Sequence, residues 1–382
     1  MWKLSDVTAQ RFPLVARPRP ACLPLGRRVK ALVDLADAAQ RQSDLSVAST
    51  VCNQAALIAS DTGDADTART MCRQHTIAYL HGAPLSARDA VRALEPVVNL
   101  VRLQLRDGHS HVGHRQFQVL FDSITAGRAA TIEGITVPYN LVATDEARRD
   151  VRTWLWTVLL ADGTRALTSA GRWKDALSHI QRHRGLAQRM LDGRQVAVVA
   201  ALASADTAHA KYLLTNTVPG EPWEAAVTDA LTVLCLRVAG QPYWRPLQNL
   251  VAAYLELPSP EGLVSFHTRL GLVVLDLVDS PTAPAARQIV ACLCRRAIEA
   301  ADGYAARDAL AYPLTKKLAS GDEVKECQRL LSSCALQAGA LPDNAGAQVG
   351  EAVGKSTRVI LETIGRPITL RAEGAGRLFP PG

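Results

Sequence analysis

A helical pattern of apolar residues runs almost without interruption from residue 28 to residue 338, and this pattern most constrains the fold. In RVKALVDLADAAQRQ, Val29, Leu32, Val33 and Ala36 fall on one face at helical spacing. Gly and Pro recur between such stretches, so the turns are short and the helices are about 15 residues long. Because short turns place consecutive helices antiparallel, we predict an all-α chain of helix pairs.

The composition changes along the chain and predicts five segments. They are an extended, basic, Pro-rich arm (1–27), an N-terminal helical domain (28–128), a connector (129–143), a helical repeat domain (144–338) and a Gly-rich tail (339–382). The connector is rich in β-branched residues, which predicts short strands around 131–138. In the tail, which we expect to be irregular or a short β hairpin, strands are predicted around 359–371.

The overall composition is that of a globular protein. The 382 residues are 48% hydrophobic and 21% charged, and the net charge of +7 permits an acidic partner without identifying one. The chain contains no run of about 18 apolar residues, and its first residues lack an apolar signal region. We therefore expect a cytoplasmic protein with no membrane partner. The eight cysteines show no CxxC spacing and are interpreted as small buried apolar side chains.

One six-residue phrase recurs where two predicted helices meet. Gly171-Arg-Trp-Lys-Asp-Ala176 is followed 34 residues later by Ala205-Asp-Thr-Ala-His-Ala210. In both, a small residue ends one helix, and an alanine five residues later is expected to be buried where two helices cross. Ser43-Asp-Leu-Ser-Val-Ala48 and Gly63-Asp-Ala-Asp-Thr-Ala68 are similar but only 20 apart, so they are not the same turn of consecutive repeats.

The phrase GRWKDAL resembles the turn between the two helices of a tetratricopeptide repeat, a family with a 34-residue period. In that frame the units are 157–190, 191–224 and 225–258, and the resemblance is confined to about these residues. The sequence departs from the family at Gly163-Thr164 and at His183. The resemblance implies a right-handed solenoid of helix pairs with a concave groove that binds a partner.

Near the C-terminus, VGEAVGKST ends like a phosphate-binding loop. That loop needs a glycine five residues before its second glycine, but Val349 stands there and Gly350 is one residue late. No predicted strand precedes it, so we expect no nucleotide and no other cofactor.

Two histidine groups and one basic helix are further candidates. His109, His111 and His114 could close on a metal, but no fourth ligand has a clear position, and a solvated loop is the simpler interpretation. His179 and His183 lie four apart on one helix face, without the glutamate of a metalloprotease motif. Arg148, Arg149 and Arg152 precede Trp154 and Trp156, a combination that can bind nucleic acid but is more typical of a solvated helix face.

The sequence therefore predicts a non-catalytic adaptor or regulatory protein that binds a peptide or partner protein in a groove. In the repeat frame, Arg165, Thr168 and Gln195 would face that groove, and Arg165 could pair with a carboxylate of the partner. Two alternatives stay open. One is an enzyme, or a helical accessory subunit of a biosynthetic enzyme, with a site between helices. The other is a regulator that binds nucleic acid. The oligomeric state is not predicted.

Overall fold

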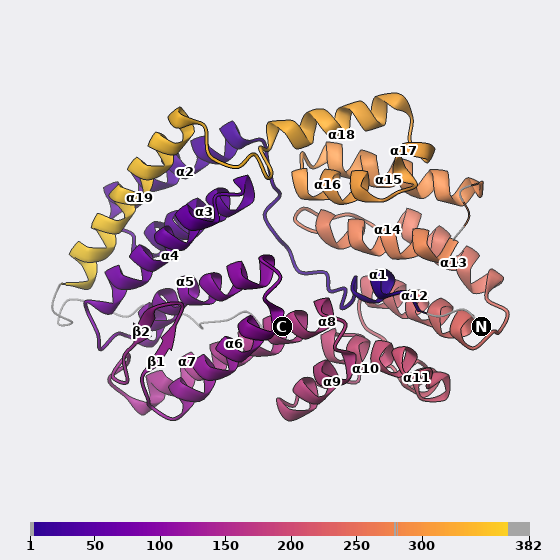
Figure 1. Ribbon diagram of the computed structural model, residues 1–382, viewed down its shortest axis with the longest axis horizontal. Coiled ribbons are helices and arrows are strands. Elements are labelled where there is room, and N and C mark those ends of the chain that lie inside the picture. The colour runs from indigo at the N-terminus through magenta and orange to yellow at the C-terminus, as the bar shows by residue number, and fades with distance from the viewer. Residues whose placement is uncertain (1–3, 279, 281, 366–382) are drawn as a thin grey trace. The chain divides into compact units, whose positions relative to one another are not determined.

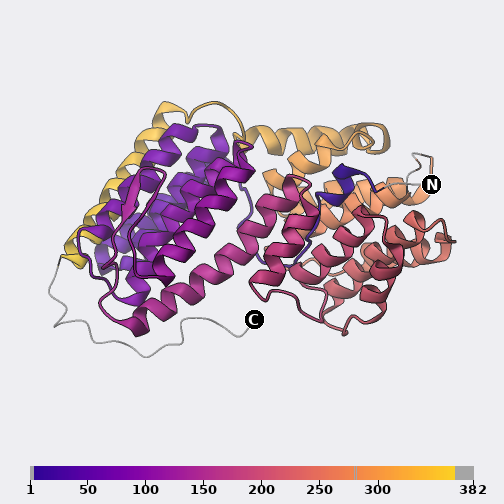
Figure 2. The same cartoon turned by 60° about the horizontal axis from the view of Figure 1, so that its bottom comes forward.

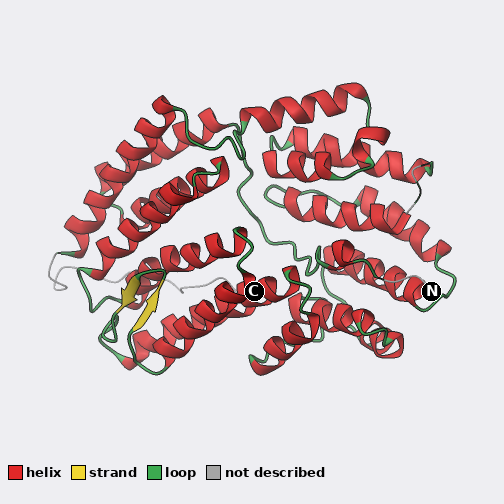
Figure 3. Cartoon of the chain, viewed as in Figure 1, coloured by secondary structure: helices red, strands yellow, loops and turns green. Residues whose placement is uncertain are grey.

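The computed structural model describes residues 4–278, 280 and 282–365, and it is predominantly helical (Figure 3). The chain divides into two compact units. Unit 1 comprises residues 1–25 and 163–336, and unit 2 comprises residues 26–162 and 337–382. The prediction of an all-α chain is confirmed.

Unit 2 is built from long helices, and from α3 to α7 each packs on the next helix in the sequence (Figure 1, Figure 2). They are α2 (Leu25–Gln42), α3 (Leu45–Thr62), α4 (Ala65–Leu80), α5 (Ala87–Arg106), α6 (Ser110–Thr125) and α7 (Asp145–Val158). Between α6 and α7, β1 (Ala130–Ile132) and β2 (Ile135–Val137) form an antiparallel hairpin, with Thr131 opposite Thr136. This hairpin confirms the strands predicted around 131–138.

Unit 1 holds shorter helices. Its helices are α1 (Asp6–Ala9), α8 (Thr164–Ser169), α9 (Trp173–Arg182), α10 (Asp192–Ala203), α11 (Thr207–Thr215), α12 (Pro222–Val238), α13 (Trp244–Glu256), α14 (Val264–Val278), α15 (Pro284–Glu299), α16 (Gly303–Ala311), α17 (Thr315–Leu318) and α18 (Gly321–Ser333). From α10 to α16 each helix contacts the next, and most also contact the next but one. The π-helical turn η1 (Leu159–Gly163) connects α7 to α8 where the chain passes between the units.

The recurring phrase is a tight turn with one backbone geometry. In each case a small residue takes a positive φ, and the next residue donates its N–H to a carbonyl five residues earlier in the preceding helix. At four of these turns that next residue is an aspartate whose carboxylate caps the following helix. The residues with positive φ are Ser43, Gly63, Gly171, Ala205 and, at a turn that the sequence pattern did not predict, Ala301.

The alanine five residues into each turn is fully buried. Ala176 and Ala210 have no exposed surface, which confirms the prediction for these two residues, and Ala48, Ala68 and Ala306 are equally buried. The turns at Ser43 and Gly63 lie at the two ends of α3, and this explains why they are only 20 residues apart.

The expectation for the C-terminal tail was wrong over most of its described length. Residues Asp343–Ile364 form helix α19, which packs on α3 and α4 through buried residues such as Val349, Val353 and Ile360. The apolar side chains at 349, 353, 360 and 364 follow helical spacing, and burying them outweighs the cost of the three glycines in the helix. The rest of the predicted hairpin, from 366 to 371, lies outside the described residues.

The turn alanines leave no room for larger side chains. Ala210→Leu should lower the free energy of unfolding by about 1–3 kcal/mol, because three added carbons must enter a packed helix crossing. Ala208→Leu, on the exposed side of the same helix α11, is the matched control and should change it by less than about 0.5 kcal/mol. Urea unfolding measures both; equal effects would contradict the packing of this turn.

A second prediction concerns His75 in α4. Its ring is buried against Tyr79, its two nitrogens have no hydrogen-bond partner among the described residues, and burial lowers its pKa to about 3. As the pH falls below about 6.5, the unfolded chain therefore binds a proton that the folded chain does not. Because of His75, the free energy of unfolding of the wild type should therefore decrease by about 2 kcal/mol when the pH falls from 7 to 5.

The variant His75→Phe keeps an aromatic ring without a titrating group. It should unfold with a weaker pH dependence than the wild type, as measured by urea unfolding at pH 7 and pH 5. His111→Phe, at an exposed position of α6, should retain the wild-type pH dependence. An unchanged pH dependence in His75→Phe would show that this ring does not contribute.

Candidate functional site

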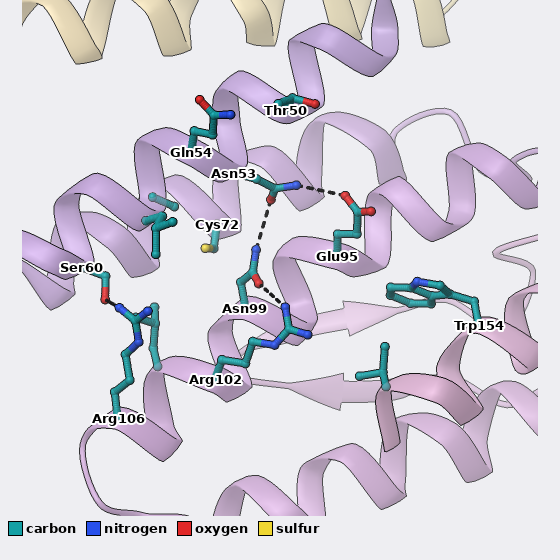
Figure 4. A pocket seen from close by; sticks show the side chains of 14 residues that line it. Thr50, Asn53, Gln54, Ser60, Cys72, Glu95, Asn99, Arg102, Arg106 and Trp154 are labelled. Atoms are coloured by element: carbon teal, nitrogen blue, oxygen red, sulfur yellow. Dashed lines mark hydrogen bonds between the residues drawn. The ribbon is translucent and has the colours of Figure 1, made fainter. Parts of the chain in front are cut away.

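Unit 2 contains a cavity of about 520 Å³ formed mainly by alternate helices (Figure 4). Most of its lining comes from α3 and α5, and α7 closes one side with Trp154 and Val158. Only Cys72 comes from α4. On α3 and α5 the lining residues recur every three or four positions, so they share one helix face. They are Thr50, Asn53, Gln54, Ala56, Leu57 and Ser60 on α3, and Glu95, Asn99, Arg102, Leu103 and Arg106 on α5.

A chain of hydrogen bonds crosses this cavity from α5 to α3 and back (Figure 4). Asn53 donates from Nδ2 to Glu95 Oε2 at 2.9 Å and accepts at Oδ1 from Asn99 at 3.2 Å. Asn99 accepts from Arg102 Nη1 at 3.0 Å, and Arg102 also donates from Nη2 to Asp162 at 2.7 Å. Each amide is held by two neighbours, so its orientation is set before any ligand arrives.

The second arginine of the cavity is anchored at the opposite end. Arg106 donates to Ser60 Oγ at 2.5 Å and pairs with Asp61 at 3.3 Å. The side chains of Arg102 and Arg106 are each 48% exposed, whereas those of their partners Asp162 and Asp61 are 14% and 3% exposed. Asp61 also pairs with Arg28 at 2.7 Å, so Arg106 shares its carboxylate with a second arginine. Arg102 and Arg106 therefore both present half-exposed guanidinium groups to the solvent.

The titratable groups of the cavity are not tuned for nucleophilic catalysis. Burial raises the pKa of the Cys72 thiol to about 12, so this sulfur is not a thiolate at neutral pH. Burial also raises the pKa of Glu95, an effect opposed by the hydrogen bond from Asn53 and the charges of Arg92 and Arg102. The arrangement offers directed hydrogen-bond donors and acceptors beside an aromatic wall.

The three residues predicted from the repeat frame lie in unit 1 and have different environments. Arg165 is exposed on α8 and makes no ion pair with a described residue. Thr168 is 2% exposed and bonds to the carbonyl of Arg165, and Gln195 is fully buried. The last two side chains therefore do not line an open groove, because their own chain already covers them. That these residues contact a partner stays a prediction.

Gln195 is covered by the N-terminal arm of its own chain. Its Oε1 accepts from the backbone N–H of Leu14 and its Nε2 donates to the carbonyl of the same residue, both at 2.6 Å. Further along the arm, the N–H of Cys22 donates to the Asp302 carboxylate and its carbonyl accepts from the N–H of Gly303. Phe12 and Leu14 are buried. The predicted arm is thus fixed on unit 1 and lacks helix or strand from residue 12 to residue 24, but it begins with helix α1, and its last residues, from Leu25, belong to α2.

The other candidates from the sequence do not form sites of their own. His109 and His111 are exposed at the start of α6, and no group of three or more His, Cys, Asp or Glu residues suited to a metal occurs in the described part of the chain. His179 and His183 contact each other, with ring centroids 4.7 Å apart. Gly350 and Gly354 lie inside α19, and Lys355 pairs with Asp37 and Glu351, both at 2.9 Å.

The sequence contains one pattern that could have indicated this cavity, a stripe of polar residues along α5. None of the residues predicted to form a site belongs to this stripe. In ARDAVRALEPVVNLVRLQLR, Glu95, Asn99, Arg102 and Arg106 interrupt the apolar pattern every three or four residues. Such a stripe on a helix with apolar neighbours indicates one face that meets solvent or a ligand. The partners Asn53 and Asp162 could not be assigned, because only the fold brings α3 and η1 to α5.

Comparison with protein-family models, curated proteins and solved structures found no match to this chain. Within the described residues, no helix has both the length and the apolar character needed to cross a membrane. The site must therefore be interpreted from its own geometry.

Glu95 gives a test of the electrostatics of the cavity. Because burial raises its pKa, the charged carboxylate disfavours the folded state at pH 7, and Glu95→Gln should increase the free energy of unfolding there. As the pH falls through the raised pKa, the folded wild type gains a proton first, so the difference should close near pH 4. Glu362→Gln, at an exposed position of α19, should show no such gain.

Urea unfolding at pH 7 and pH 4 provides the comparison. The prediction is contradicted if Glu95→Gln is less stable than the wild type at pH 7. In that case the attraction of Arg92 and Arg102 stabilises the charged carboxylate by more than burial destabilises it.

Proposed function

We propose that this chain is a non-catalytic binding protein, and that the cavity of unit 2 holds an extended segment of a partner polypeptide. The observation that carries this proposal is the lining by alternate helices α3, α5 and α7, with α4 and α6 following them in the chain. This is the arrangement expected if α3–α4 and α5–α6 are stacked helix pairs whose first helices form an inner face. The proposed groove thus lies N-terminal to the region that resembles tetratricopeptide repeats.

The polar groups of the cavity suit a peptide backbone. An asparagine amide has two N–H donors, and the described contacts of Asn53 and of Asn99 each use one of them, leaving the second for a ligand carbonyl. Gln54 makes no side-chain hydrogen bond to a described residue, so its amide can accept an N–H and donate to a carbonyl. Leu57, Leu103 and Trp154 provide apolar contact for the side chains of the ligand.

The charge balance favours backbone recognition over recognition of a polyanion. Arg102 pairs with Asp162, Arg106 shares Asp61 with Arg28, and Glu95 adds a further acidic group. A nucleic acid would require uncompensated positive charge along the cavity. The volume of about 520 Å³ lies in the range of known ligand pockets.

Peptide display on the immobilised full chain, followed by calorimetric titration of the selected peptides, tests this proposal. Asn99→Ala and Asn53→Ala should each weaken binding of the selected peptides at least about tenfold, because each removes preoriented backbone contacts. Asn344→Ala, on the exposed face of α19, is the matched control and should bind like the wild type.

Thermal unfolding of each variant separates loss of binding from loss of fold. If the selected peptides bind folded Asn99→Ala and Asn53→Ala with wild-type affinity, the cavity is not the binding site. If no peptide from the library binds the wild-type chain, the proposed function is wrong.

A further inference from the structure

The cavity of unit 2 contains one carboxylate that no arginine contacts. Glu95 is the only acidic residue among those that line the cavity. Its Oε2 accepts a hydrogen bond from Asn53 at 2.9 Å, and within residues 4–278, 280 and 282–365 it makes no ion pair. An amide donates a hydrogen bond but brings no positive charge. The negative charge of Glu95 is therefore not paired by a direct contact in this part of the chain.

The neighbouring arginines of α5 are held by other carboxylates. Arg92 pairs with Asp89 at 3.0 Å. Arg102 uses all three of its guanidinium nitrogens, with Nε and Nη2 on Asp162 at 3.1 and 2.7 Å and Nη1 on Asn99 at 3.0 Å. The charges of the two arginines reduce the rise that burial causes in the pKa of the cavity carboxylate, but this pKa stays raised. A ligand cation could thus reach the carboxylate without breaking either ion pair.

Trp154 adds an aromatic ring to the side of the cavity where Glu95 lies. It belongs to α7, which packs on α5. Figure 4 shows Glu95 and Trp154 on the same side of the cavity, away from Arg106. The face of an indole ring attracts a cation that lies over it. A carboxylate and an indole in one cavity together suit a cationic group on an apolar stem, such as a basic side chain.

We infer that the partner segment held in this cavity carries a lysine or arginine whose charged end pairs with Glu95 and whose stem lies along Trp154. This inference rests on the proposed function and adds the chemistry of one ligand side chain. The ligand cation supplies a charge-assisted contact to Glu95 in a partly buried place, where such a contact is stronger than at the open surface. An acidic side chain at the same place would be repelled by Glu95.

The sequences of peptides selected by display on the full chain give the first test. The wild type should select peptides with Lys or Arg enriched at one position, and Glu95→Gln should not, because its amide carries no charge. Glu362→Gln, at an exposed position of α19, removes the same charge from the same unit and should select as the wild type does. The net charge of +7 disfavours non-specific binding of basic peptides, so the enrichment reports on the site.

The identity of the enriched residue refines the inference. Enrichment of Arg over Lys would identify a guanidinium that stacks on the indole ring, and enrichment of Lys over Arg would identify an ammonium group. Both results support a basic ligand side chain.

Calorimetric titration then measures the contact itself. Replacing the enriched Lys or Arg of a selected peptide by norleucine should weaken binding to the wild type about tenfold and leave binding to Glu95→Gln nearly unchanged. Trp154→Leu should weaken binding of the basic peptide about threefold more than binding of the norleucine peptide, because leucine has no ring to attract the cation. Trp244→Leu, at an exposed position of α13, should change neither.

The possible failures can be told apart. Thermal unfolding checks that Glu95→Gln folds, and if it does not, the norleucine peptide on the wild type decides the question. If no peptide binds the wild type, the proposed function is wrong and this inference fails with it. If peptides bind and Asn99→Ala weakens them, but neither a basic preference nor an effect of norleucine is found, the cavity binds peptides and only this inference is overturned.

Discussion

The fold of this chain depends on how the backbone groups at the ends of its helices find hydrogen-bond partners. Every helix leaves backbone N–H groups at its start and carbonyls at its end without partners. At five places a residue with positive φ lets the chain satisfy carbonyls of the preceding helix, and at four of them an aspartate caps the next helix. At four of the five turns the two joined helices pack on each other, and the alanine five residues later is fully buried there; these pairs are α3–α4, α8–α9, α10–α11 and α15–α16. Antiparallel neighbours follow directly from this turn chemistry.

The geometry of the candidate site is a consequence of that arrangement. When consecutive helices are antiparallel, alternate helices can present side chains to a common space, as α3, α5 and α7 do around the cavity of unit 2. Polar residues at three- and four-residue spacing then face one another across the space. The hydrogen bonds among Asn53, Glu95, Asn99 and Arg102 hold these side chains in place on helices.

The two arginines of the cavity in unit 2 differ in how their charges are paired. Arg102 pairs with Asp162, which is more buried than the arginine itself. Arg106 pairs at 3.3 Å with Asp61, and the same carboxylate pairs with Arg28 at 2.7 Å. The cavity therefore offers hydrogen-bonding groups whose charges are largely held within its own ion pairs.

The sequence by itself determined the local structure of this protein. Helical spacing, the turn phrases and the β-branched connector predicted an all-α chain, the buried Ala176 and Ala210 and the hairpin near 131–138, because these features depend on neighbouring residues alone. Helix α19 was missed because burial against α3 and α4 outweighs the poor helix propensity of its glycines. Gln195 was expected in an open groove, but the arm residue Leu14, 181 positions earlier in the chain, covers it. Only the tertiary structure decided which polar residues meet, since Asn53 on α3 and Asn99 on α5 are brought together by helix packing and not by their spacing in the sequence.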